Sequence, residues 1–349
     1  MRRRWIVLAV VAALLVAAAV VAVWRLRGDD RSRLAEALSL APTSAARYSW
    51  TDWAGVRREL GADLSPSSSA DDVEAFLDAA FDRDLSSTTA LQESAPTLQE
   101  ELGFSPATLD WELFAQGTDG ALVIMGLPED GDVAALRERL RSVGFTEPEE
   151  DDGVWRGGVD LLEGLGGPVT PELAALAVDE DDGLLIGSDD PDFLAEWREL
   201  ARGDREDGVS EVGDAVGSAL SAAIATGDQA CSALAMTEAD PADRTRAGEL
   251  VEQAGGVHPM TGFAIAAQPG GDVRVAMAFE TPRQARADAD SRSVLASGPA
   301  PGQGGSFADR FRLGRVVAEG RVLTMALEPV DGAFVVSDLS HGPVLFATC

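Results

Sequence analysis

Apolar residues recur with two different periods along the chain, and these periods predict the fold. Within 70–81 they stand three or four positions apart, which is typical of a helix with one buried face, and a further helix is expected over 282–296. Two strand-like runs, 109–116 and 121–127, flank the sequence Gly-Thr-Asp-Gly at 117–120, which is typical of a β-hairpin turn. The pattern predicts an α+β protein in which antiparallel sheets pack against helices.

The predicted elements follow the same order twice. Residues 46–204 and 205–349 each run strand, helix, hairpin, helix, hairpin. In the second part we expect the first strand at 230–236, and a hydrophobic helix over 212–224 that packs between the two parts. We interpret the repeated order as an internal duplication that gives two similar halves, each with its own sheet. The alternative is that any α+β chain of this size alternates in a similar way.

An uninterrupted apolar segment precedes these halves. Residues 6–23 are all apolar, and Trp5 and Trp24 bracket them. As a helix, this stretch spans about 30 Å, the thickness of a bilayer's hydrocarbon core, and tryptophan is enriched at both membrane interfaces. We therefore predict an N-terminal transmembrane helix within 1–27 that contacts the lipid bilayer through residues 5–24, followed by a spacer over 28–45.

The flanking arginines support insertion but leave the orientation open. Three arginines stand at 2–4 and four between 25 and 33, so the positive-inside rule is nearly balanced. A basic start before an apolar run is also how export signals begin, and we expect an uncleaved anchor in the cell membrane with the domain outside the cytoplasm. The alternatives are cleavage near the alanines at 17–19 and a domain that faces the cytoplasm.

Two cysteines, Cys231 and Cys349, are the only ones in the chain. An even number of cysteines in an exported protein favours a disulfide, because oxidising compartments form and preserve such bridges. This bridge would tie down the very C-terminus. Two unpaired thiols in the core are the alternative.

The charge and composition exclude several functions. The formal net charge is -31, and a field of this sign repels nucleic acid, so we expect no nucleic-acid partner. The sequence has no lysine, and all 28 basic residues are arginine. A P-loop, a pyridoxal phosphate site and a kinase site each need a lysine, so none of these can be built from this chain. We predict no cofactor.

Several acidic and glycine-rich segments resemble ion-binding or phosphate-binding loops, but each has a simpler interpretation as a turn or a connection. Acidic runs at 149–152, 179–182 and 189–192 offer oxygen ligands for Ca²⁺, but they lack the spacing of a calcium loop, and Asp-Gly at 182–183 is typical of a hairpin turn. The glycines of 302–306 follow prolines rather than a strand, so a flexible connection is expected there instead of a phosphate loop.

A few further side chains are of the types used in catalysis or ligand binding. Ser337, Asp338 and His341 are the residue types of a hydrolase triad, but they are too close in sequence to aim at one another and no nucleophile elbow is present. His258 and His341 are the only histidines, and we expect both in loops. Tryptophans could line a groove for a sugar or peptide, although core packing is the commoner role; the four concerned are Trp50, Trp53, Trp111 and Trp155. We predict no catalytic, cofactor-binding or metal-ligating residue.

The segments YSWTDWAGVRREL at 48–60 and LGFSPATLDWELF at 102–114 resemble uncharacterised actinobacterial membrane-anchored or exported proteins. This resemblance implies a lineage and a location, and it carries no catalytic motif. Together with the predicted anchor, it leads us to expect a non-enzymatic extracytoplasmic binding or scaffold module whose partner is an unknown envelope protein or ligand. The alternative is an envelope hydrolase with an unidentified carboxylate site.

Overall fold

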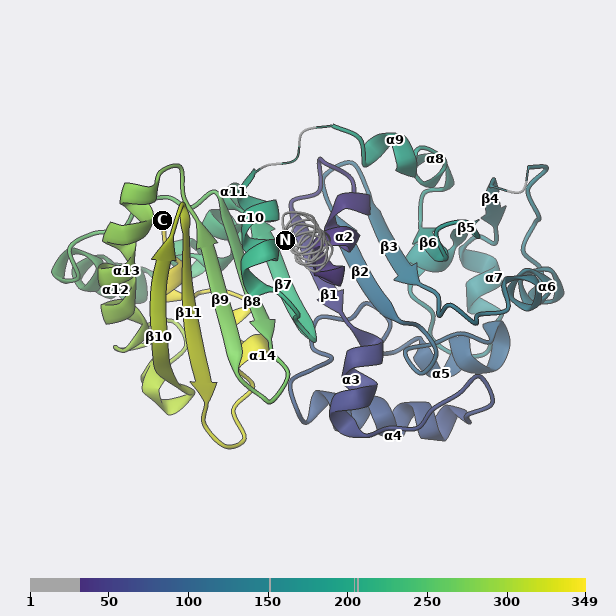
Figure 1. Cartoon of the computed structure of the whole chain (residues 1–349), viewed down its shortest axis with the longest axis horizontal. Helices are drawn as coiled ribbons and strands as arrows, with labels where there is room; N and C mark the ends of the chain where they lie inside the picture. Colours follow the sequence, from purple (N-terminus) through teal and green to yellow (C-terminus); the bar gives the residue numbers. More distant parts are fainter. Residues whose placement is uncertain (1–31, 151, 204, 206) are drawn as a thin grey trace, which may run out of the picture.

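One antiparallel sheet runs through the whole molecule (Figure 1). The computed structural model describes residues 32–150, 152–203, 205 and 207–349. Within these residues the sheet has 11 strands in the order β10-β11-β9-β8-β7-β1-β2-β3-β6-β5-β4. The strands are β1 (Arg47–Thr51), β2 (Trp111–Gln116), β3 (Ala121–Gly126), β4 (Val154–Arg156), β5 (Ala175–Asp179), β6 (Leu184–Ser188), β7 (Ser221–Thr226), β8 (Gly262–Ala267), β9 (Val273–Ala278), β10 (Phe311–Glu319) and β11 (Val322–Pro329).

Helices cover both faces of the sheet and give two hydrophobic cores. On one face, α2 and α10 lie side by side over the centre, and α8 and α9 lie over the strands of the first half (Figure 1). These helices are α2 (Arg33–Leu40), α8 (Pro191–Ala195), α9 (Trp197–Leu200) and α10 (Asp207–Val216). We call this the first face. It contains the smaller core, in which alternate residues of the strands meet the apolar sides of these helices.

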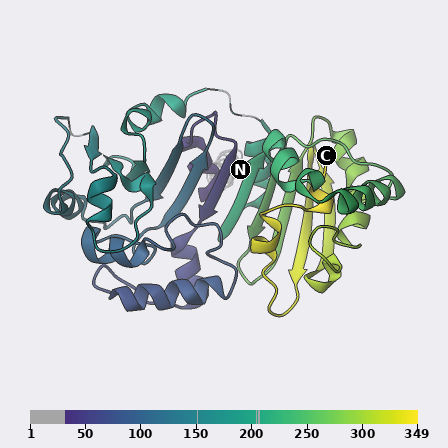
Figure 2. The same cartoon turned by 180° about the vertical axis from the view of Figure 1, so that it is seen from behind.

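The second face carries two separate groups of helices, one over each end of the sheet (Figure 2). The group over β2 to β6 consists of α3 (Trp53–Leu60), α4 (Ala70–Phe81), α5 (Ala95–Thr97), the π-helix η1 (Leu98–Leu102), α6 (Val133–Val143), α7 (Val159–Glu163) and the short η2 (Pro171–Leu173). The group over β8 to β11 consists of α11 (Gly227–Gln229), η3 (Ala230–Leu234), η4 (Met236–Glu238), α12 (Pro241–Gln253), α13 (Pro282–Ala296), η5 (Phe307–Asp309), α14 (Val335–Leu339) and η6 (Leu345–Ala347).

Local sequence signals set the limits of the longest helices. Helix α4 begins at a capping box in which Ser69 and Asp72 bond to each other's backbone N–H groups. Helix α13 begins with a second box formed by Thr281 and Gln284, with Pro282 at the first helical position. The predicted helices over 70–81 and 282–296 are confirmed, as is the predicted hairpin of β2 and β3.

The two halves have the same strand connectivity. In the first half the spatial order is β1-β2-β3-β6-β5, with β4 added at the edge, and in the second it is β7-β8-β9-β11-β10. Strands β1 and β7 pair with each other, in antiparallel register, at the centre. The expected α+β class with antiparallel pairing is confirmed, but the expectation of one sheet per half is wrong, because the β1–β7 ladder joins both halves into a single sheet.

Two predicted elements near residue 220 are also wrong. The expected helix over 212–224 ends at Val216 in α10, and the chain then turns at Gly217, whose φ is +67°, and enters β7. The expected strand over 230–236 is helical, in η3 and the start of η4. Alanine favours helices, so the small residues of β7 resemble a helix in sequence, but pairing with β1 and β8 on both sides makes them a strand.

The described residues begin just after the predicted anchor. Residues 5–24, with Trp5 and Trp24, lie outside the described part of the chain. No helix within 32–349, apart from the few residues left undescribed there, is long and apolar enough to cross a bilayer. Residues 33–40 of the predicted spacer form α2, in which Leu34, Ala37 and Leu38 are buried against the sheet and α10. This part of the spacer therefore belongs to the globular fold.

Candidate functional site

A cleft of about 330 Å³ lies on the second face, where the two groups of helices leave the centre of the sheet uncovered. Its floor comes from β1, β2, β7 and β8. The loop 87–90 of the first half forms one wall, and the segments 229–234 and 340–342 of the second half form the other. Both halves of the molecule therefore contribute to the cleft, which has the volume of a small ligand pocket.

Small and half-exposed side chains on the central strands leave this space open. At the rim, Arg47 of β1 lies opposite Gln116 of β2. Two residues further along β1, Ser49 lies between Phe114 of β2 and Ala223 of β7. Ser49, Phe114 and Ala223 are only partly buried, although they belong to strands at the centre of an 11-stranded sheet. In the described part of the chain, this patch lies between the two groups of helices on the second face and forms the floor of the cleft.

The floor of the cleft has a signature in the sequence, which is the alternation of polar and apolar residues along β1 and β2. This alternation was not among the features from which a site was predicted. On the first face, β1 and β2 present the buried apolar side chains Tyr48, Trp50, Leu113 and Ala115. On the second face, the alternate positions of the same strands are Arg47, Ser49, Thr51, Glu112, Phe114 and Gln116. Strands at the centre of a sheet with helices on both faces are usually apolar throughout. Polar alternation in such strands therefore marks this face, on which Arg47, Ser49, Phe114 and Gln116 are exposed or half-buried whereas Thr51 and Glu112 are buried.

A buried carboxylate holds the loop that closes the inner end of the cleft. Glu112 is almost completely buried and accepts hydrogen bonds from Thr89 Oγ1 (2.6 Å), the Ala90 backbone N–H (2.7 Å) and Trp53 Nε1 (3.1 Å). Burial raises the pKa of Glu112 to about 6, and the three donated hydrogen bonds oppose this rise because they stabilise the charged form. Glu112 thus fixes Thr89 and Ala90, which line the cleft.

A second carboxylate connects the halves beside the cleft. Asp84 has a φ of +56°, and its carboxylate accepts hydrogen bonds from the backbone N–H groups of Val336 (2.6 Å) and Ser337 (3.1 Å) in α14. Burial raises the pKa of Asp84, while these hydrogen bonds lower it. Asp84 of the first half therefore holds α14 of the second half, and α14 leads directly into the wall segment 340–342.

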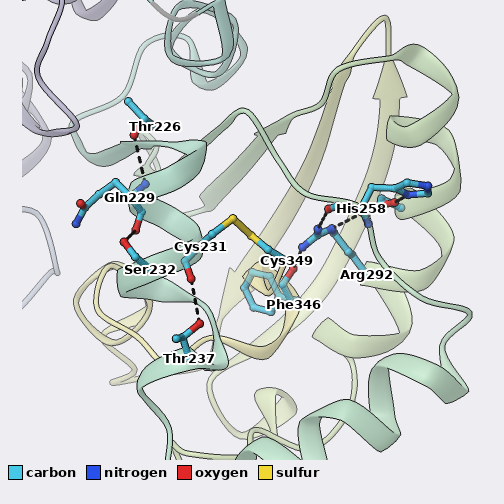
Figure 3. The surroundings of a disulfide bond; sticks show 10 residues. Thr226, Gln229, Cys231, Ser232, Thr237, His258, Arg292, Phe346 and Cys349 are labelled. Carbon is cyan, nitrogen blue, oxygen red and sulfur yellow. Dashed lines mark hydrogen bonds and ion pairs between the residues drawn. A yellow bond between two sulfur atoms is a disulfide. The ribbon is translucent and has the colours of Figure 1, made fainter.

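A disulfide fixes the opposite wall. Cys231 in η3 and Cys349 at the C-terminus are joined, with their Cα atoms 5.6 Å apart, across 118 residues of sequence (Figure 3). The returning chain also bonds to η3 directly, because the Val344 N–H donates to the Leu234 carbonyl at 2.7 Å. The helical segment that carries Gln229 and Leu234 into the cleft is thus attached to the C-terminal segment at two points.

A buried ion pair holds the C-terminal segment from the other side. In α13, Arg292 and Asp288 are both fully buried, and Arg292 Nε donates to Asp288 Oδ2 at 2.8 Å. Arg292 also donates to the carbonyls of Phe346 (2.6 Å) and His258 (2.7 Å), as Figure 3 shows. His258 Nδ1 lies 2.5 Å from Asp288 Oδ1. Arg292 therefore ties α13 to the residues next to the disulfide, which is a structural role.

The candidate triad residues do not come together as a catalytic site. Ser337 lies at the N-terminal end of α14, where its backbone N–H bonds to Asp84, and Asp338 forms an ion pair with Arg310 at 3.4 Å. His341 Nδ1 lies 3.1 Å from Ser340 Oγ, on the cleft wall. His341 is thus the one member of this group that lines the cleft.

The other sequence candidates occupy structural positions. Asp179 is buried and paired with Arg198 at 2.7 Å, and Asp190 caps α8. Within the described residues, no three His, Cys, Asp or Glu side chains are placed to share a metal ion. The segment 302–306 is a glycine turn before η5, not a loop between a strand and a helix. Three of the four tryptophans are buried in the cores and Trp111 is half-buried against Trp50, so none of them lines the cleft.

Comparison with known proteins adds little beyond the geometry. No protein-family model and no curated protein matches the sequence. Among solved structures, the chain is similar to one titled "Structure of crystal form I of TP0453", with 8% sequence identity and a TM-score of 0.41. The match covers 87% of this chain and 96% of that chain. A likeness this distant does not extend to function.

Proposed function

We propose that this protein is a non-enzymatic binding module of the cell envelope, and that the central cleft binds a small, partly apolar ligand. The observation that carries the proposal is the uncovered floor of the cleft. Phe114, Ser49 and Ala223 are partly exposed on strands at the centre of the sheet, between the two groups of helices on the second face. A concave, mostly preformed cavity with a few polar groups at its rim is the usual form of a small-molecule site.

The rigidity of the walls supports the same function. Loop 87–90 is held by Glu112, and the opposite wall is held by the Cys231–Cys349 disulfide and by Asp84. Structural support of this kind around a cavity preorganises it, and preorganisation reduces the entropy lost on binding.

The proposal also covers the cellular location of the protein and the origin of its two halves. We propose that residues 5–24 anchor the chain in the cell membrane with the domain outside the cytoplasm; the length of the apolar segment and the two cysteines support this. We also propose that the halves derive from one duplicated unit. Their identical strand connectivity and the central β1–β7 pairing are its support.

The alternative of an envelope hydrolase finds less support. Among the described carboxylates, Glu112 and Asp84 combine burial with a raised pKa, which can mark catalytic acids. However, the carboxylate oxygens of both residues accept hydrogen bonds from protein groups, and neither residue lines the cleft. Their positions are those of residues that hold loops in place.

Binding of a neutral aromatic amide tests this function. The full-length protein in lipid nanodiscs is titrated with 2-naphthamide by ligand-observed NMR, with empty nanodiscs as the blank. We expect one site with a Kd on the order of 0.1 to 1 mM, as for other fragment-sized ligands. Ala223→Phe, which fills the half-buried floor, should weaken binding at least about tenfold, because the ligand and the new ring cannot share the cavity.

The matched control is Ala242→Phe on the exposed surface of α12, which should leave binding unchanged. Far-ultraviolet circular dichroism checks that both variants remain folded. Equal affinity in the wild type and in Ala223→Phe would contradict the assignment of the cleft as the binding site.

A further inference from the structure

The rim of the cleft carries a cation that is not neutralised by a carboxylate. Arg47 is exposed, and its guanidinium donates through Nε (2.9 Å) and a second nitrogen to Gln116 Oε1, a neutral acceptor. Within the described part of the chain, no carboxylate lies within ion-pair distance of Arg47. Because Gln116 accepts through its oxygen, its amide NH₂ group is also a donor at the rim, and no described residue accepts a hydrogen bond from it.

The lining of the cleft contrasts with the rest of the protein. The chain has 59 Asp and Glu against 28 basic residues, yet the described residues that line the cleft include no Asp or Glu. A different surface hollow, between the start of α6 and the β5–β6 turn, is lined by Glu129, Asp130 and Asp132 together with the acidic run 180–182. An acid-free lining with Arg47 at its rim makes the cleft less negative than the surface around it, which favours an anionic group there over other parts of the molecule.

Part of the lining of the cleft is apolar. Phe114 and Phe263 contribute aromatic surface to the floor, and Leu234 contributes an aliphatic side chain from η3. The cleft therefore combines apolar surface on its floor and wall with cationic and hydrogen-bond donor groups at its rim. His341 lies on the wall of the same cavity.

We propose that the ligand of the cleft has an apolar body and one anionic group, a carboxylate, phosphate or sulfate, that accepts hydrogen bonds from Arg47 and Gln116. This inference rests on the proposed binding function and adds the chemical class of the ligand. A guanidinium and an adjacent amide provide parallel N–H donors that match the oxygens of such a group. The apolar body occupies the space above Phe114 and Ala223.

The test uses two ligands of the same shape and different charge, 2-naphthoate and 2-naphthamide. Both are titrated against the full-length protein in nanodiscs at neutral pH, with empty nanodiscs subtracted. Arg47→Gln should reduce the affinity for 2-naphthoate about tenfold, as expected for the loss of a charge-assisted hydrogen bond at a partly exposed site. It should change the affinity for 2-naphthamide by less than about twofold. Added salt should weaken the binding of the carboxylate alone.

Two further variants make the result specific. Arg47→Lys keeps the positive charge but loses the planar guanidinium, so it should weaken the binding of 2-naphthoate less than Arg47→Gln does. Arg246→Gln, on the exposed surface of α12, should have no effect on either ligand. One outcome is that 2-naphthamide binds in the cleft while Arg47→Gln reduces the affinity for both ligands equally, or for neither. In that case the proposal of an anionic ligand is wrong and the proposed binding function stands. If neither ligand binds, both proposals are wrong.

Discussion

The two halves of the molecule share a scaffold and differ in the chemistry of the face that forms the cleft. The β1–β7 ladder is centred on the pair Ser49 and Ala223, so a two-fold relation about this pair makes Glu112 of β2 equivalent to Phe263 of β8. In the first half this face of the central strands is polar. In the second half it is apolar, with Phe263, Ile265 and Ala267 in the core.

Because of this difference, one connectivity supplies both a support and the surface to which we assign the proposed binding role. The second half uses the face to pack its own helices, whereas the first half leaves part of it uncovered and uses Glu112 to hold a loop beside the opening. If the halves began as copies, the cleft arose where their sequences diverged, at the junction where both halves supply walls. The proposed binding then depends on the difference between the halves, whereas the stability of the protein depends on the scaffold that they share.

The halves also differ in what holds them together. All seven tryptophans of the chain precede residue 205, so tryptophan fluorescence reports on the first half and on the predicted anchor only. The second half contains the disulfide and the fully buried Arg292–Asp288 pair. If the two halves unfold together, a substitution that destabilises the second half therefore changes the unfolding curve measured by the tryptophan fluorescence of the first half.

Removal of the disulfide should have the largest effect. The double variant Cys231→Ser with Cys349→Ser opens a loop of 118 residues, and the chain-entropy model gives a loss of roughly 4 to 5 kcal/mol in the free energy of unfolding. Urea denaturation of the oxidised wild type and the double variant measures this loss. A reducing agent should destabilise the wild type and leave the variant unchanged; equal stability of the two proteins would contradict a structural role for the bridge.

Arg292→Met should have the next largest effect, about 3 to 4 kcal/mol, because it leaves the buried Asp288 carboxylate without its cationic partner. The β1–β7 ladder and the shared core under α2 and α10 should make the two halves unfold together. We therefore expect the urea midpoint to fall by the same amount when it is followed by tryptophan fluorescence and by circular dichroism.

The control for this variant is Arg246→Met, which removes an exposed ion pair with Glu249 and should cost less than about 1 kcal/mol. An unchanged fluorescence midpoint in Arg292→Met, with a lowered midpoint by circular dichroism, would mean that the halves unfold independently.

Much of the scaffold could be predicted because its signals are local. Capping residues and helical periodicity defined α4 and α13, and turn sequences defined the hairpins. The single sheet could not be predicted in this way, because it depends on the pairing of β1 with β7, which is a long-range contact with no local signal. Strand β7 was assigned to a helix for the same reason, since its alanines favour a helix until two neighbouring strands pair with it.

The site was harder to predict than the scaffold. The acidic runs, the histidines and the triad-like residues are the usual sequence signals of a catalytic or metal site, and of these residues only His341 lines the cleft. The informative feature was the alternation of Arg47, Ser49 and Thr51 in a strand whose other face is apolar. It could be interpreted only after β1 was known to be central, because an edge strand with the same sequence would simply face water.

The smallest predicted effect concerns the position where the two halves differ most, Glu112 against Phe263. The pKa of Glu112 is about 6 in the folded protein, against 4.5 for the exposed side chain. Between these values the folded state binds more protons than the unfolded state, so the contribution of Glu112 to stability is present below about pH 4.5 and is lost as the pH rises through about 6. The loss is about 2 kcal/mol.

Glu112→Gln isolates this contribution from those of the other carboxylates. The amide cannot accept all the hydrogen bonds from Trp53, Thr89 and Ala90, which gives the variant a constant loss of stability at every pH. The free energy of unfolding of the wild type minus that of the variant should fall by about 2 kcal/mol from about pH 4 to about pH 7 and then stay level. A difference that does not change with pH would contradict the raised pKa of Glu112. The hydrogen bonds from Thr89, Ala90 and Trp53 would then offset the effect of burial in full, and Glu112 would hold loop 87–90 equally well at every pH in this range.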